Sequence, residues 1–162
     1  MDVKFVNAFV GAISNVFKTM LSTEVQVGKP TVKNAELVSA EVSGIIGLSG
    51  EIQGCVVLSF PGDAACAVAS KFAGIDLDMD NPDFPDAIGE LANMVAGNAK
   101  KDFTGYETSI SLPSVIIGKG HKVSQSKVWP FLVIPCKTSL GSFNVEVALI
   151  TSKKPAMAGA PA

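Results

Sequence analysis

The stretch that decides the fold is Asp86 to Phe103, DAIGELANMVAGNAKKDF. Its apolar residues recur every three or four positions, which predicts an amphipathic helix. At about 100° per residue, one broad side of that helix is apolar and must face a sheet. This apolar arc consists of Ile88, Leu91, Ala92, Val95, Ala99 and Phe103.

The opposite side of the predicted helix is polar and faces solvent. A glycine there costs about 0.5–1 kcal/mol relative to alanine and adds nothing to a core. It does leave a gap beside the neighbouring side chain, where another molecule can approach. We therefore take this polar stripe as the candidate site, with flanking lysines as candidate contacts for a binding partner; its residues are Asp86, Glu90, Asn93, Gly97, Lys100 and Lys101.

Glu90 and Asn93 are three residues apart, so they project together from the polar stripe. An asparagine carboxamide both donates and accepts hydrogen bonds, so it can orient a water molecule, but it is no base at neutral pH. Phosphoryl transfer depends mainly on placement and charge stabilisation. The pair is therefore a plausible water-positioning device whose metal and cation come from a partner. The same two residues are also ordinary on a solvated helix face.

The composition of the 162-residue chain favours one well-buried domain, since 48% of its residues are hydrophobic and 17% are charged. A net charge of -2 without a basic cluster argues against nucleic-acid binding. No apolar segment approaches the roughly 18–20 residues of a membrane span. The N-terminal region, residues 5–21, predicts an amphipathic helix rather than a signal peptide. We expect a cytoplasmic protein that contacts no membrane.

The cysteines and the single histidine offer no catalytic or metal-binding pattern. Cys55, Cys66 and Cys136 lie in apolar runs without CxxC spacing, so we expect buried, reduced thiols and no metal site. His121 lies in the glycine-containing segment GKGHKVS and is expected to be a solvated loop residue. No pairing with a serine or cysteine nucleophile is evident.

The remaining sequence predicts an α+β fold, with a largely antiparallel sheet covered by helices, in a single domain over residues 1–152. Residues 45–63 predict a hairpin with its turn near Gln53–Gly54. A short helix should follow, capped by Asp63 and ended by Gly74. Strands are expected within residues 107–120, 126–139 and 141–153, and a disordered tail over 153–162.

The pattern Asp86-x-x-x-Glu90-x-x-Asn93-x-x-x-Gly97, within GELANMVAGNA, resembles the phosphatase helix of the CheC/CheX/FliY family, and its CheX branch most closely. Further segments resemble that branch in the same order along the chain: VNAFVGAI (6–13), GKP (28–30), IIGLSGEIQGCVVLSFP (45–61) and SLPSVI (111–116). The resemblance covers nearly everything before the tail.

The resemblance implies a phosphatase of the chemotaxis response regulator CheY. By position, Asn93 would orient the water that attacks the receiver's aspartyl phosphate, and Glu90 would pair with the receiver's active-site lysine. Asp86 would have a capping or contact role, and Gly97 would let the receiver's loops come close. The Mg²⁺ and the phosphorylated aspartate would both belong to the receiver, so that no cofactor of its own is expected.

The resemblance also implies a homodimer with sheet pairing across the subunits. Only one site per chain is expected, as in the CheX branch, because neither Asn7 nor Asn15 in the first helix follows a glutamate by three residues. The alternative function is a non-catalytic adaptor that docks a receiver domain or a flagellar switch component through the same face. A small-molecule enzyme is a third possibility, although no nucleophile, cofactor loop or metal set supports it.

Overall fold

The computed structural model describes residues 3–34, 38–124 and 131–151. The described residues form three helices and eight strands. The helices are α1 (Val3–Leu21), α2 (Gly62–Ala73) and α3 (Phe84–Lys100). The strands are β1 (Gln26–Val27), β2 (Thr31–Val32), β3 (Val42–Gly50), β4 (Ile52–Phe60), β5 (Thr108–Ile110), β6 (Ser114–Ile117), β7 (Leu132–Thr138) and β8 (Gly141–Thr151).

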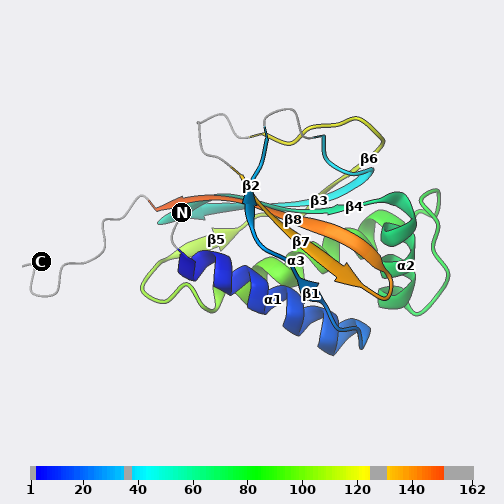
Figure 1. The fold of residues 1–162 in the computed structure, drawn as a ribbon, viewed down its shortest axis with the longest axis horizontal. Coiled ribbons are helices and arrows are strands. Elements are labelled where there is room, and N and C mark those ends of the chain that lie inside the picture. The colour runs from blue at the N-terminus through cyan, green and yellow to red at the C-terminus, as the bar shows by residue number, and fades with distance from the viewer. Residues whose placement is uncertain (1–2, 35–37, 125–130, 152–162) are drawn as a thin grey trace, which may run out of the picture.

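All eight strands belong to one antiparallel sheet, with the order β1-β7-β8-β4-β3-β5. The short strand β2 also pairs with β7 at one edge, and β6 pairs with β3 near the other edge. All three helices lie on the same side of this sheet, as Figure 1 shows. The prediction of an α+β fold with a largely antiparallel sheet covered by helices is therefore confirmed.

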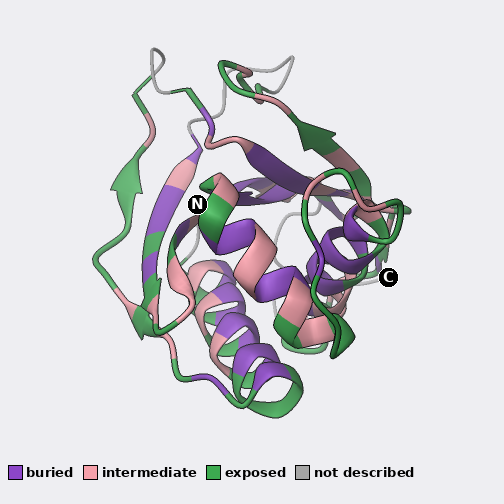
Figure 2. Cartoon of the chain, turned by 90° about the vertical axis from the view of Figure 1, so that its right-hand side faces the viewer, coloured by how far each residue is buried: buried purple, intermediate pink, exposed green. Residues whose placement is uncertain are grey.

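The main core fills the space between the helices and one face of the sheet. Alternate residues of the long strands point into it, for example Ile46 in β3, Val56 in β4 and Val145 in β8. Figure 2 shows buried residues along the helices, with exposed residues on their outer sides. Phe5 of α1 meets Phe103 edge to face, with ring centroids 5.3 Å apart, so the start of α1 packs near the end of α3.

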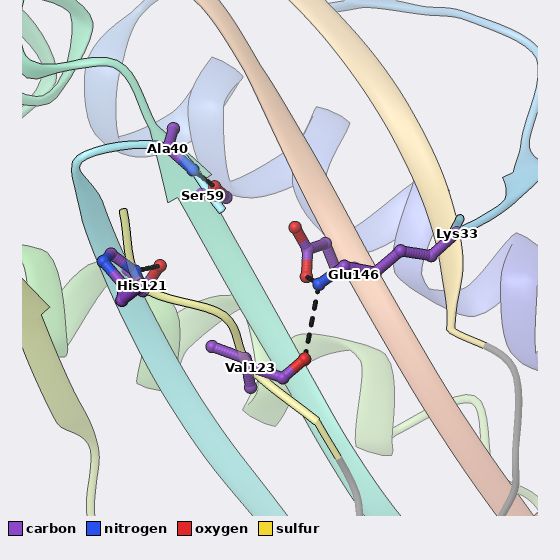
Figure 3. A network of polar contacts seen from close by, with 7 residues as sticks. Lys33, Ala40, Ser59, His121, Val123 and Glu146 are labelled. Atoms are coloured by element: carbon purple, nitrogen blue, oxygen red, sulfur yellow. Dashed lines mark hydrogen bonds and ion pairs between the residues drawn. The ribbon is translucent and has the colours of Figure 1, made fainter. Parts of the chain in front are cut away.

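The opposite face of the sheet carries a second, smaller apolar cluster made of Cys55, Val57, Phe131 and Ala148. The described parts of the connections between β2 and β3 and between β6 and β7 lie over this face in Figure 1. Polar contacts hold the described parts of both connections against the sheet (Figure 3). No helix of the described residues has the length and apolar character needed to cross a membrane.

The predicted position of the hairpin turn is wrong. Strands β3 and β4 are separated at Glu51, next to Gly50 with φ of 107°, whereas Gln53 and Gly54 already lie in β4. Gly54 has φ of 142°, and a Cβ there would lie only 1.8 Å from the carbonyl oxygen of Ala148. Gly54 is therefore required by the close approach of β8 inside the sheet, a requirement that looks like a turn signal in the sequence.

The ends of the helices also differ from the prediction. Helix α3 begins two residues earlier, at Phe84, and ends at Lys100, so Phe103 is buried in the following turn rather than in the helix. Asp63 lies within the first turn of α2 and does not cap it, because Pro61 is at the N-cap. Gly74 does end α2 in the left-handed conformation, with φ of 73°.

Two predictions about single side chains need correction. His121 is not a solvated loop residue, because its ring contacts Ser43 and the carbonyl of Gly118, each at 2.7 Å. Cys66 is only half-buried, although Cys55 and Cys136 are buried and all three are free thiols.

The segment 107–120 forms two short strands, β5 and β6, rather than one. The predicted tail, 153–162, and the first residues of the predicted strand 126–139 lie outside the described residues.

Candidate functional site

Helix α3 carries the candidate site and is held close to the sheet. Its buried face includes Ile88 and Ala92, which lie over Gly44 of β3. A Cβ at position 44 would be 3.2 Å from atoms of both side chains, so only a glycine there lets the helix lie this near. The helix axis and the direction of its outer face are therefore fixed by packing.

The outer face of α3 presents most of the predicted site residues together. Glu90, Asp86 and Lys100 are exposed, whereas Asn93 and Gly97 are half-buried. Lys101 is exposed but stands at the C-cap, one residue beyond the helix. Asp86 lies in the first turn, where a negative charge is stabilised by the helix dipole.

The polar groups of Glu90 and Asn93 are available to another molecule. Within the described parts of the chain, neither side chain makes a hydrogen bond or an ion pair. Because the two residues are one helical turn apart, the carboxylate and the carboxamide face the same region of solvent. Together the two groups can accept a hydrogen bond from a cationic group and hold a water molecule in a set direction.

The space around the two glycines of α3 differs sharply. A Cβ at Gly97 would meet only Cδ1 of Ile110, at 4.0 Å, so the fold does not require a glycine there. A Cβ at Gly89 would lie 3.2 Å from Cγ of Pro113, which is tight packing. Gly97 therefore leaves an opening beside Asn93, as the sequence predicts, and Gly89 is explained by contact with the connection between β5 and β6.

That connection runs beside the outer face of α3 and borders a surface groove. No local pattern in the sequence marks this neighbour of the site, although Pro113 in the segment SLPSVI indicates a break between strands. The groove is lined by Pro85, Asp86, Gly89, Glu90, Pro113 and Val115.

The structure also brings together a serine and a histidine that the sequence did not pair. The distance from Oγ of Ser43 to Nε2 of His121 is 2.7 Å. Ser43 is 0% exposed on the face of the sheet away from α3, so no substrate reaches its hydroxyl. The other ring nitrogen of His121 contacts the carbonyl of Gly118. This pair therefore anchors the connection between β6 and β7.

No group of three or more histidine, cysteine, aspartate or glutamate side chains in the described residues is arranged to hold a metal ion. The chemistry that the outer face of α3 itself offers is that of two carboxylates, Asp86 and Glu90, one carboxamide and nearby lysines. Burial raises the pKa of the Cys136 thiol from its ordinary value of 9.0 to about 12. Burial also raises the pKa of Cys66. Both thiols therefore resist ionisation near neutral pH.

The sequence matches the family described as "Chemotaxis phosphatase CheX" over residues 42–137, a range that includes α3. The CheY-P phosphatase CheX of Thermotoga maritima is 33% identical over 127 residues, which are 76% of this chain and 81% of that protein. The crystal structure of the chemotaxis protein CheX from Desulfovibrio desulfuricans superposes with a TM-score of 0.82 at 34% identity, covering 90% of this chain and 99% of that one.

A further similar structure is the CheX-CheY-BeF3-Mg+2 complex from Borrelia burgdorferi, with a TM-score of 0.75 and 27% identity, covering 90% of this chain and 97% of that one. The fold and the outer face of α3 thus define a chemotaxis protein of the CheC-like class. Within that class, the chain belongs to the CheX family.

Proposed function

We propose that this protein is a phosphatase that accelerates hydrolysis of the aspartyl phosphate of a CheY-like response regulator. The observation that carries the proposal is the pair Glu90 and Asn93 on the outer face of α3, whose polar groups have no partner among the described residues. The family match and the relative named as a CheY-P phosphatase support the same activity.

In this mechanism, Asn93 orients the attacking water. Its carboxamide accepts one hydrogen bond from the water or donates one to it, and so places the water in line with the phosphorus atom. The carboxamide does not remove the proton, because it is no base at neutral pH. Its contribution is positional, which suits the loose transition state of phosphoryl transfer.

Glu90 fixes the docking geometry in the proposed complex. Its exposed carboxylate pairs with a lysine of the receiver, and Asn93, one turn further along α3, then enters the receiver's active site. Asp86, Lys100 and Lys101 provide further polar contacts around this point. The Mg²⁺ and the phosphorylated aspartate belong to the receiver, in keeping with a solved CheX relative that forms a complex with CheY, BeF3 and Mg+2.

The test is the loss of ³²P-phosphate from a phosphorylated CheY-like receiver, with the parent protein compared with Asn93→Ala. We expect the variant to lose at least about 100-fold in rate, which corresponds to about 2.7 kcal/mol. Asn7→Ala is a matched control, since Asn7 is an exposed asparagine on α1. Equal rates for the parent protein and Asn93→Ala would remove the catalytic role.

The alternative is an adaptor that binds a receiver or a flagellar switch component without hydrolysis. A complex that forms while the receiver's phosphate lifetime stays unchanged would favour it. Two further properties form part of the proposal: the chain is a homodimer, and it acts in the cytoplasm, where phosphorylated receivers occur. Light scattering that gave only the monomer mass at high concentration would contradict the homodimer.

A further inference from the structure

Leu112 is the most exposed large hydrophobic residue among those described, with 89% of its surface accessible. A single exposed leucine is common on protein surfaces and needs no special explanation. Leu112 differs from that ordinary case in two ways: its backbone is held in place, and it stands beside the outer face of α3.

Hydrogen bonds hold the residue before Leu112 against β3. The backbone N–H of Ser111 donates to the carbonyl of Gly47, and the N–H of Gly47 donates to Oγ of Ser111, each at 2.8 Å. Oγ of Ser111 in turn donates to the carbonyl oxygen of Leu112, also at 2.8 Å. The backbone that leads into Leu112 therefore has a defined conformation.

The residue after Leu112 is fixed as well. Pro113 packs on α3 at Gly89, and a proline restricts the residue before it to extended conformations. Leu112 is thus ordered on both sides, while its own side chain is in solvent. Because the backbone on both sides of Leu112 is held, little backbone entropy is lost when a partner covers the side chain.

The position of Leu112 relative to α3 follows from two contacts that its neighbours make. Ile110 lies beside Gly97, and Pro113 lies beside Gly89. From Ile110 to Pro113 the extended chain advances three residues, or about 10 Å. From Gly97 to Gly89 the helix spans eight residues, or about 12 Å, so the connection runs alongside this part of α3. Asn93 is midway between those two glycines, so the connection passes Asn93 at the level of Ser111 and Leu112.

We propose that Leu112 is a second docking residue for the phosphorylated receiver, beside Glu90, and contributes to affinity and partner choice, while Asn93 orients the attacking water. The inference rests on the proposed function. The occupant is the receiver because a specific protein interface buries roughly 800 Å² per partner. That area exceeds one helix stripe, so a receiver seated on Asn93 must also cover the adjoining connection. An apolar patch beside Leu112 on the receiver completes the interface.

The experiment compares the parent protein with Leu112→Ser and Leu112→Met. Phosphate release is measured over a range of receiver concentrations, and binding is measured by titrating the receiver loaded with Mg²⁺ and BeF₃⁻, which mimics the phosphoryl group. Val32→Ser is the matched control, because Val32 is 64% exposed on β2, at the opposite edge of the sheet.

For Leu112→Ser we expect the half-saturating receiver concentration to rise at least about tenfold, with the maximal rate within about twofold of the parent. A tenfold rise corresponds to about 1.4 kcal/mol. Leu112→Met and Val32→Ser should stay close to the parent. Thermal unfolding of Leu112→Ser should match the parent, because the side chain is 89% exposed and contributes almost nothing to the core.

The outcomes separate this inference from the phosphatase proposal. If Leu112→Ser binds the receiver and releases phosphate like the parent, the docking role is overturned and the phosphatase proposal stands. If the parent binds the BeF₃⁻-loaded receiver through Leu112 but does not shorten the phosphate lifetime, the docking role stands and the phosphatase proposal fails. If the parent does not bind the loaded receiver, both fail.

Discussion

Nζ of Lys33 lies 2.6 Å from Oε2 of Glu146, and the two side chains are 8% and 1% exposed. The ammonium group also lies 5.0 Å from the ring centroid of Phe131 and donates to the carbonyl of Val123. The pair is on the face of the sheet that the helices do not cover (Figure 3). It therefore ties the segments beside β2 and β7 to the middle of the sheet.

Replacing Lys33 by methionine should destabilise the fold by about 3–5 kcal/mol, because it leaves the carboxylate of Glu146 buried without a counter-charge. Denaturant unfolding of the parent protein and Lys33→Met measures this difference. Lys29→Met, at an exposed position nearby in the chain, should cost much less. The double variant Lys33→Met/Glu146→Gln should regain part of the loss, since no buried charge remains. A Lys33→Met variant as stable as the parent would contradict this role.

Glu90→Gln should weaken docking of the receiver more than it slows the chemical step. The substitution keeps the size of the side chain and removes the charge that, in the proposed complex, pairs with the receiver's lysine. We expect the half-saturating receiver concentration to rise about threefold or more at low ionic strength. The difference should shrink at high salt, where exposed charges are screened. Glu24→Gln, at another exposed glutamate, is the control, and an effect independent of salt would argue against an ion pair.

Gly97→Ala should separate stability from activity. The added methyl group meets only Ile110, at 4.0 Å, so the gain in helix propensity of about 0.5–1 kcal/mol should appear in the free energy of unfolding. Phosphate release should fall, because the methyl group occupies the opening beside Asn93.

Gly89→Ala gives the comparison on the same helix. Its methyl group would lie 3.2 Å from Pro113, so this variant should gain little stability or lose some. If Gly97→Ala were more stable than the parent and fully active, the opening at position 97 would have no part in docking.

The stability of the fold should fall in alkaline solution through Cys136. Its pKa is raised by burial to about 12, whereas the unfolded thiol ionises near its ordinary value of 9.0. A group with a raised pKa in the folded state stabilises fully below the unfolded pKa, and that contribution is lost as the pH rises from about 9 towards 12. Between pH 8 and pH 10.5, the advantage of the parent over Cys136→Ala should shrink by roughly 1–2 kcal/mol. An unchanged difference in denaturant unfolding would show that the thiol does not titrate in this way.

The elements with a strong repeat could be predicted from the sequence, and those set by distant contacts could not. Helix α3 was predicted to within three residues at each end because its apolar and polar faces alternate clearly. The hairpin turn was misplaced because Gly50 and Gly54 are both glycines in a strand-prone run, and only the approach of Ala148 distinguishes them. The repeat of apolar residues indicates which face of an element a residue lies on, but not which distant strand comes close to it.

The polar contacts on the far face of the sheet illustrate the same limit. His121 is held by Ser43, which is 78 positions away, and Lys33 pairs with Glu146, which is 113 positions away. Neither pairing leaves a local pattern in the sequence. The polar stripe of α3 is a local property of one helix, so the sequence predicts which residues share that face, whereas the place of Leu112 beside it depends on the packing of Pro113 on Gly89.

Asn93 lies on a helix, whereas Leu112 lies on the connection between β5 and β6. This separation has a consequence for how related signalling pathways are kept apart. A cell with several related receivers must keep their signals apart, and under the proposed docking role the segment that selects among them can diverge while the helix stays constant. Grafting residues 110–115 from one paralogue onto another would then produce a chimera with the donor's choice of receiver and the recipient's turnover.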